Sequence, residues 1–345
     1  MISISRRRFW RVTLGAGGLL GLGAAAKRAW LSEHVDDRAA RAAEPHEHTS
    51  TSSIFGAPIS ITAVHGDPAL AGRAVEAALG ELRRVERIMS LYCPESQLSR
   101  LNRNGVLHAP HPWLVEVLQQ SQTLAQQSGG AFDMTVQPLW HVYRDAQLAA
   151  STAADRDVEI ALRKVDWRRV EVSPEIVRLQ SGGTQLTLNG IAQGFAADRA
   201  AAVLRAHGVR DAMIDAGEIA ALGCRSDESQ WKVGIQHPRE RQAYAAVAGL
   251  SGRCLSTSGD YATSFSSDHC QNHLLDPRTG KSPSWFSSVS VVAPTAVRAD
   301  GLSTALSVMG LEEGLKLLQK TANTDALFIF KDGRELATAG FPRCA

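Results

Sequence analysis

Apolar residues recur at helical spacing in four separate segments of the chain. In the first segment Asp67-Pro68 supplies a helix start, and apolar residues follow every three or four positions as far as Met89. The second is stopped by Ser128-Gly129-Gly130, and the third runs from Asn189-Gly190 to His207-Gly208. These patterns predict helices over residues 68–89, 112–127, 190–207 and 298–310.

Short runs rich in β-branched and other apolar residues lie between these helices. They predict strands over residues 59–64, 185–188, 212–215, 231–235, 245–250, 289–292 and 326–330. The strands come in groups with helices inserted between the groups, which favours an α+β fold over a strictly alternating parallel sheet. No Gly-x-Gly-x-x-Gly motif follows a strand and no Walker-type loop occurs, so a bound nucleotide would be held in another way.

The N-terminus is similar to a twin-arginine export signal. Three arginines at 6–8 precede Phe9, and an uncharged run rich in Gly and Ala follows at 12–26. This run is too short and too mildly apolar to cross a hydrocarbon core of ~30 Å comfortably, although an uncleaved signal would still tether the protein to a membrane. We therefore predict a periplasmic protein.

The segment after the signal has the composition of a linker. Residues 32–53 are polar, with a Ser/Thr cluster at the end, and the folded part is expected to begin near Ile54. No later break is long enough to separate two domains. We assign residues 1–43 to the signal and linker and residues 44–345 to a single domain.

Composition narrows the class of partner. The 345 residues are 44% hydrophobic and 21% charged, which is ordinary for a globular protein. Lysine and arginine together number 37 against 35 acidic residues, so net charge implies no surface for nucleic acid. The 5 cysteines are scattered without metal-binding spacing, which argues against a zinc or iron–sulfur centre; disulfides are permitted but not demanded.

One pair of polar residues suggests a cation site. Asp300 and Thr304 are four residues apart on the last predicted helix, so they present two hard oxygen atoms to the same side. A small divalent cation requires such atoms. An Asp near a helix start also serves as a cap or stabilises the helix dipole, and that alternative stays open at this point.

Five further segments combine glycine with polar residues. Each alone fits ordinary turn chemistry. Together with the Asp300 segment, and in this order, they resemble the ApbE family of FAD:protein FMN transferases over about residues 55–330. The matching pieces are Tyr92 with Ser-x-Leu-Ser-Arg-x-Asn at 96–102, Gly-Gly-Ala-Phe-Asp at 129–133, Gly-Ile-Ala-x-Gly-Phe at 190–195, Thr-Ser-Gly-Asp-Tyr at 257–261, His-x-x-Asp-Pro-x-Thr-Gly at 273–280 and Ala-Asp-Gly-x-x-Thr at 299–304.

The resemblance implies an α+β fold related to the tunnelling fold. It also implies FAD as donor substrate and Mg²⁺ at the pyrophosphate. These enzymes move the FMN half of FAD onto a threonine hydroxyl of a client protein through a phosphoester bond and release AMP. Such an attack at phosphorus needs a cation, a base near the hydroxyl and a rigidly held donor.

The resemblance names the metal ligands. Asp300 and Thr304 would bind Mg²⁺ through their side chains and Gly190 through its carbonyl, while Ser303 supplies another oxygen where some relatives have Asp. A set of oxygen donors completed by water and phosphate suits magnesium better than zinc.

Flavin-binding and catalytic positions carry over in the same way. Phe55 falls where the family usually has Met near the isoalloxazine, and Leu275 would pack on the cofactor. His273 is the candidate base, with Asp300 the second catalytic residue, although a loop histidine that only hydrogen-bonds FAD or Asp276 also fits. The remaining flavin-binding matches are Tyr92, Ala131, Phe132 and Asp133.

Two positions depart from the family. Thr187 stands where relatives usually have Asp, and Gln193 where they have Lys or Glu. Both still form hydrogen bonds, so FAD binding should be weakened or retuned before it is lost.

Three functions remain open at this stage. The first is a periplasmic flavin transferase, similar to NosX-type members that serve a membrane-bound, NosR-like electron-transfer protein. The second is a hydrolase that cleaves FAD to FMN and AMP with water as the nucleophile. The third is a non-catalytic flavin-binding assembly factor.

Overall fold

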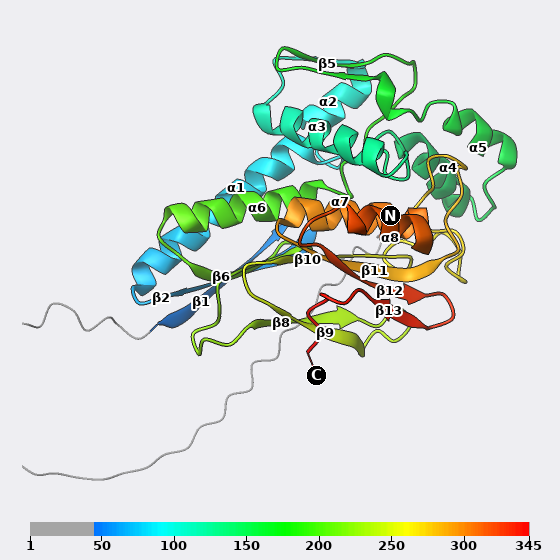
Figure 1. The fold of residues 1–345 in the computed structure, drawn as a ribbon. Coiled ribbons are helices and arrows are strands. Elements are labelled where there is room, and N and C mark those ends of the chain that lie inside the picture. Colours follow the sequence, from blue (N-terminus) through cyan, green and yellow to red (C-terminus); the bar gives the residue numbers. More distant parts are fainter. Residues whose placement is uncertain (1–44, 345) are drawn as a thin grey trace, which may run out of the picture.

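The computed structural model describes residues 45–344, and the predicted export signal lies outside these residues. Its centre is an antiparallel sheet of 8 strands in the order β1-β2-β6-β7-β10-β11-β12-β13. Helices α1, α6, α7 and α8 cover one face (Figure 1). The strands are β1 (His46–Ile54), β2 (Ala57–His65), β6 (Asp211–Asp215), β7 (Ile219–Leu222), β10 (Cys254–Gly259), β11 (Phe286–Ala293), β12 (Asp325–Phe330) and β13 (Glu335–Ala337); the helices are α1 (Pro68–Met89), α6 (Ala192–Ala206), α7 (Ala296–Met309) and α8 (Leu311–Gln319).

Two smaller units complete the fold. The hairpin of β8 (Trp231–Gln236) and β9 (Tyr244–Leu250) packs its apolar side chains against the other face of the large sheet, in a second core cluster. The second unit is drawn above the helix layer in Figure 1. It contains a sheet of three strands in the order β3-β5-β4, which contacts α2 and α3, while α4 and α5 lie to one side (Figure 1). Its elements are α2 (Gln97–Asn104), β3 (Val106–His108), α3 (Pro112–Gln127), α4 (Gln137–Leu148), α5 (Asp155–Leu162), β4 (Val170–Val172) and β5 (Ile176–Leu179).

The helices predicted from local pattern are confirmed. The Asp67 side chain accepts hydrogen bonds from two amides of the first turn of α1, as an N-cap should, and the apolar stripe of the helix is buried. Helix α3 has the predicted bounds, while α7 begins at Ala296, two residues before the predicted start, and ends at Met309, directly before Gly310. Together with the large sheet, these helices confirm a single domain of the α+β class.

The strand predicted at 185–188 is wrong. Only Gln185 makes an isolated bridge, with Val136. The backbone of Leu186 pairs instead with the Asn102 side chain, whose amide nitrogen donates to the Leu186 carbonyl at 2.9 Å and whose oxygen accepts from the Leu186 amide at 2.7 Å. A side chain thus satisfies polar groups that a strand would satisfy in a ladder.

The linker predicted to reach residue 53 is also shorter than expected. Residues 46–54 form β1, and every one of them pairs with β2. The strand lies at the edge of the sheet, and apart from Ile54 its residues are half-buried or exposed to solvent. This exposure explains why the composition of the strand resembles that of a linker. The hairpin closes through Phe55 (φ 54°) and Gly56 (φ 71°), the positive angles of a type I′ turn.

Among residues 45–344 no helix is both long enough and apolar enough to cross a membrane.

Candidate active site

Helices α6 and α7 bring the predicted metal ligands together. Gly194 donates its amide to Oδ2 of Asp300 at 3.0 Å, and the Asp300 side chain is buried. A Cβ on Gly190 would lie 2.8 Å from Oγ1 of Thr304, so the backbone of Gly190 lies directly against that hydroxyl. The structure therefore brings Gly190, Asp300 and Thr304 to one place, although Gly190 lies more than a hundred residues before the other two.

This donor set fits a magnesium ion. A carboxylate, a hydroxyl and a backbone segment that only glycine allows to approach are hard oxygen ligands of the kind Mg²⁺ prefers. Among the described residues there is no group of three or more His, Cys, Asp and Glu side chains that could hold a metal ion.

The Ser303 hydroxyl is held by hydrogen bonds inside the protein, and its role as a metal ligand stays a prediction. Its side chain is fully buried, and its hydroxyl lies 3.1 Å from that of Ser256 and 2.8 Å from that of Ser258, while it also donates to the Asp300 carbonyl at 2.9 Å. Ser258 in turn lies 3.3 Å from Oγ1 of Thr304. Ser303 thus joins α7 to β10, and this serine network orients the Thr304 hydroxyl.

Thr187 and Gln193, the two positions that depart from the family, make hydrogen bonds with backbone groups of the protein. The Gln193 amide donates to the Ala216 carbonyl at 3.1 Å. A Cβ on Gly217 (φ +89°) would lie 2.5 Å from Nε2 of Gln193, so the turn after β6 closes tightly on this side chain. Thr187 receives the Asn189 amide on its hydroxyl at 3.3 Å, and its own amide donates to the Met134 carbonyl at 2.8 Å. That last bond ties the α6 start to the Gly-Gly-Ala-Phe-Asp turn.

Asp133 organises that turn. Its Oδ1 accepts from the amide and the hydroxyl of Thr135, at 2.7 and 2.6 Å, and its Oδ2 accepts from the Trp167 amide at 3.1 Å. Burial raises the pKa of Asp133, and the hydrogen bonds from Thr135 and Trp167 oppose that shift. Ala131 and Phe132, which precede it, are buried. The carboxylate therefore shapes the turn, and its contact with the flavin stays a prediction.

Phe55 and Tyr92 line one cavity. Its volume is about 190 Å³, and its other lining residues are Gly56, Glu86, Ser90 and Cys93. The Phe55 amide donates to Oε1 of Glu86 at 2.6 Å, which holds the turn of the first hairpin against α1. Tyr92 is 64% exposed, unusual for an aromatic ring and suited to one that stacks on a ligand. Two flavin-binding residues predicted from distant motifs therefore border the same space.

His273 and Leu275 lie on the segment between β10 and β11. Both the amide and Nδ1 of His273 lie near the Thr263 carbonyl, at 3.0 and 3.1 Å, so a short hairpin holds the ring. Leu275 is only 5% exposed and belongs to an apolar cluster with Leu139, Tyr143, Val158 and Ala161 of α4 and α5. Its side chain packs against α4 and α5 and supports the loop, and its contact with the cofactor stays a prediction.

The sequence did not predict the buried ion cluster of Asp260, Arg239 and Lys331 at the base of this segment. Asp260 is 1% exposed and accepts a bidentate pair of hydrogen bonds from Arg239, both at 2.8 Å. Lys331 bonds the same carboxylate and donates to the His269 carbonyl at 3.1 Å. The Thr-Ser-Gly-Asp-Tyr motif was the only signal for this site, since its two cationic partners come from distant segments.

The profile of the ApbE family matches residues 55–328 of the chain. The chain belongs to this family. A curated relative, the FAD:protein FMN transferase of Treponema pallidum, is 30% identical, and the alignment covers 96% of this chain and 94% of that protein.

Solved structures agree with this assignment. The apo form of the flavinyl transferase ApbE from Pseudomonas stutzeri is 28% identical, with a TM-score of 0.73 over 86% of this chain and 95% of that chain. An ApbE protein from Thermotoga maritima is 23% identical, with a TM-score of 0.76 over 87% of this chain and 100% of that chain, and it supports the fold alone.

Proposed function

We propose that this protein is a Mg²⁺-dependent FAD:protein FMN transferase. It attaches FMN from FAD to a threonine hydroxyl of a client protein by a phosphoester bond and releases AMP. The observation that carries the proposal is the convergence of Gly190, Asp300 and Thr304 at the α6–α7 contact, inside a chain whose relatives bear this enzyme name.

Asp300, Thr304 and the Gly190 carbonyl would hold the cation. When bound, Mg²⁺ neutralises charge on the pyrophosphate oxygens and favours attack at phosphorus. The protein supplies rigidity: Gly194 fixes the Asp300 carboxylate, and the Ser258–Ser303 pair fixes the Thr304 hydroxyl.

His273 is suited to accept the proton of the incoming hydroxyl. A carbonyl oxygen only accepts hydrogen bonds, so the contact with Thr263 places the ring proton on Nδ1 and the lone pair on Nε2. A neutral imidazole held in this tautomer acts as a general base near pH 7.

The departures at Thr187 and Gln193 should retune FAD affinity. Gln193 bonds the Ala216 carbonyl where a charged side chain occurs in relatives, so it contributes no charge to the site. Restoring the family residues through Thr187→Asp and Gln193→Lys should lower KM for FAD with little change in kcat.

The export signal suggests that transfer takes place in the periplasm, with a membrane tether if the signal stays uncleaved. The client we favour there is a membrane-bound, NosR-like electron-transfer protein with an acceptor threonine. Expressing the full chain and fractionating the cells tests whether the protein is found in the periplasm. Incubating it with candidate client domains and measuring their covalent flavin tests the partner.

The decisive experiment incubates the protein with FAD, Mg²⁺ and a client domain and then measures covalent flavin fluorescence in a denaturing gel. Fluorescent client is expected, with none for Asp300→Ala or after chelation by EDTA, and undiminished transfer by Asp332→Ala, a surface aspartate on the loop after β12. Release of free FMN without labelled client would instead identify an FAD hydrolase. Undiminished labelling by Asp300→Ala would refute the metal mechanism.

A further inference from the structure

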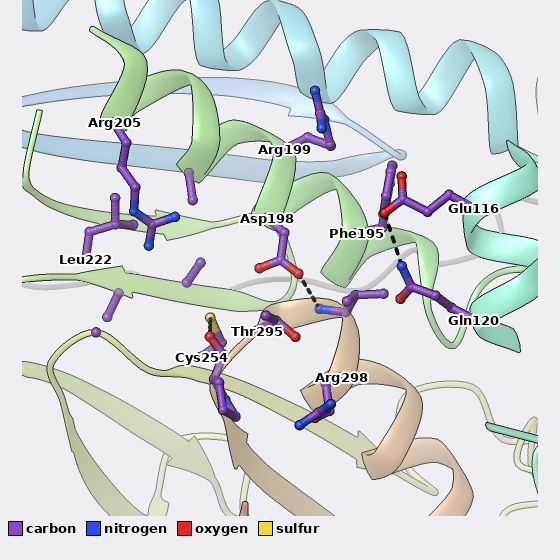
Figure 2. Close-up of a pocket in the computed structure, with 16 residues that line it drawn as sticks. Glu116, Gln120, Phe195, Asp198, Arg199, Arg205, Leu222, Cys254, Thr295 and Arg298 are labelled. Carbon is purple, nitrogen blue, oxygen red and sulfur yellow. Dashed lines mark hydrogen bonds between the residues drawn. The ribbon is translucent and has the colours of Figure 1, made fainter. Parts of the chain in front are cut away.

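A second cavity lies at the other end of the α6–α7 pair. Its volume is about 420 Å³, within the range of small-molecule pockets. Figure 2 shows residues of α3, α6, α7 and the strand ends of the sheet around it. The floor is apolar and buried, formed by Phe195, Ala201, Ala220, Ala221 and Leu222.

This cavity is separate from the candidate active site. Its wall contains the first turn of α7, at Thr295, Val297 and Arg298, whereas the proposed metal ligand Thr304 lies farther along the same helix. With a rise of 1.5 Å per residue, Asp300 lies about 6 Å and Thr304 about 12 Å along the axis from Ala296, where the helix begins. Neither Asp300 nor Thr304 lines the cavity.

The acidic groups of the cavity are already engaged. Asp198 accepts hydrogen bonds from the first two amides of α7, Ala296 and Val297, at 2.8 and 2.9 Å. The positive end of the α7 dipole thus offsets its charge. Glu116 accepts from the Gln120 side chain at 3.2 Å on the opposite wall, as the dashed line in Figure 2 marks.

Two arginines have unused donors. Arg205 of α6 and Arg298 of α7 are exposed, line the cavity, and make no side-chain hydrogen bond or ion pair with other residues in 45–344. Arg199 differs, because its guanidinium lies 4.5 Å from the Trp113 ring and points toward α1 in Figure 2. The guanidinium forks of Arg205 and Arg298 match carboxylate and phosphate oxygens.

We propose that this cavity is a second ligand site, which binds a small anion carrying a flat apolar body. The anionic group would bind Arg205 and Arg298 at the rim, and the apolar body would cover the floor beside Phe195 and Leu222. The buried floor and the limited volume favour a small molecule over a peptide.

The probe for this site is 1-anilinonaphthalene-8-sulfonate, an aromatic anion whose fluorescence rises on binding. Titrated into the whole protein without FAD or client, it should bind saturably, and Arg205→Gln with Arg298→Gln should weaken it at least tenfold because charge-assisted hydrogen bonds are lost. Arg73→Gln, an exposed arginine of α1, is the matched control and should leave the affinity unchanged. AMP and benzoate serve as competitors that distinguish a phosphate from a carboxylate ligand.

Displacement by either competitor would support the site and identify its anionic group. Unchanged probe affinity in the double arginine variant, or displacement by neither competitor, would overturn the proposal. Asp300→Asn provides the separation from the proposed function: it should abolish flavin transfer and leave probe binding intact, whereas loss of probe binding in that variant would place the probe in the transfer site. The double arginine variant should retain its unfolding midpoint and its transfer activity, since both side chains are exposed and unbonded in the described structure.

Discussion

Replacing Gly194 by alanine tests the packing of α6 against α7. An added Cβ would lie 2.6 Å from the Ala296 carbonyl carbon and 2.8 Å from Cβ of Asp300. Carbon atoms in contact are separated by about 3.5–4.0 Å, so the two helices would have to move apart by roughly 1 Å. Such overpacking costs about 1–3 kcal/mol of unfolding free energy.

The same movement should impair transfer more than it impairs folding. Gly194 holds the Asp300 carboxylate, so a shift of α7 displaces a proposed metal ligand, and a misplacement of about 1 Å costs on the order of a hundredfold in rate. Chemical denaturation and initial rates of client labelling measure the two effects. We expect a lower denaturation midpoint, and kcat reduced on the order of a hundredfold at saturating Mg²⁺.

Gly80→Ala is the matched control. Gly80 lies in α1, and no atom outside its own helix neighbourhood lies within 4 Å of an added Cβ. Alanine there should raise stability by about 0.5–1 kcal/mol through helix propensity and leave transfer unchanged. If Gly194→Ala behaves like Gly80→Ala in both assays, the close α6–α7 contact does not govern the site.

Three further predictions concern other parts of the site. Asp260→Asn leaves two cations without their buried partner and should lower the unfolding free energy by about 3–5 kcal/mol in denaturant titrations, whereas a loss below 1 kcal/mol would contradict a buried ion cluster. Burial raises the pKa of Asp133 in the folded protein above the ordinary value of 3.8, so its contribution to stability is complete below pH 3.8 and is lost as pH rises through the folded pKa. The stability of wild type relative to Asp133→Asn should accordingly fall across that window, and a flat difference would refute the assignment. Phe55→Gly relieves the strain of a positive φ but also removes a side chain packed against the core, so KM for FAD is the informative readout: it should rise, and an unchanged KM would exclude Phe55 from the flavin site.

Local patterns predicted the elements whose stability is local. Helices α1 and α3 have the predicted bounds because a capping residue, a proline and an apolar stripe define them within a few turns. The strand predicted at residues 185–188 does not form because the side chain of Asn102, far away in sequence, hydrogen-bonds the backbone amide and carbonyl of Leu186. Residues 46–53 were predicted as a linker but form a strand, because an edge strand needs no apolar face to pair with its neighbour.

In the candidate site, too, motifs predicted some features and only the packing of the elements revealed others. Motif resemblance named Asp300, Thr304 and Gly190, and the structure brings them together. Motifs did not reveal that Ser303 bonds β10 and the Asp300 carbonyl, or that Leu275 is covered by α4 and α5. Those outcomes depend on which element packs against each side chain, and sequence spacing along one element carries no such information.

The sequence by itself determined the family and the fold class, because these follow from ordered motifs and short-range pattern, and its resemblance to the family predicted which residues supply oxygen donors. Only the tertiary structure decided where those donors meet. Gly190 and Gly194 lie more than a hundred residues before Asp300 and Thr304, and the contact exists because glycine lets the start of α6 approach α7 to a distance that no side chain would allow. The same packing leaves Arg205 and Arg298 facing a cavity at the far end of the helix pair.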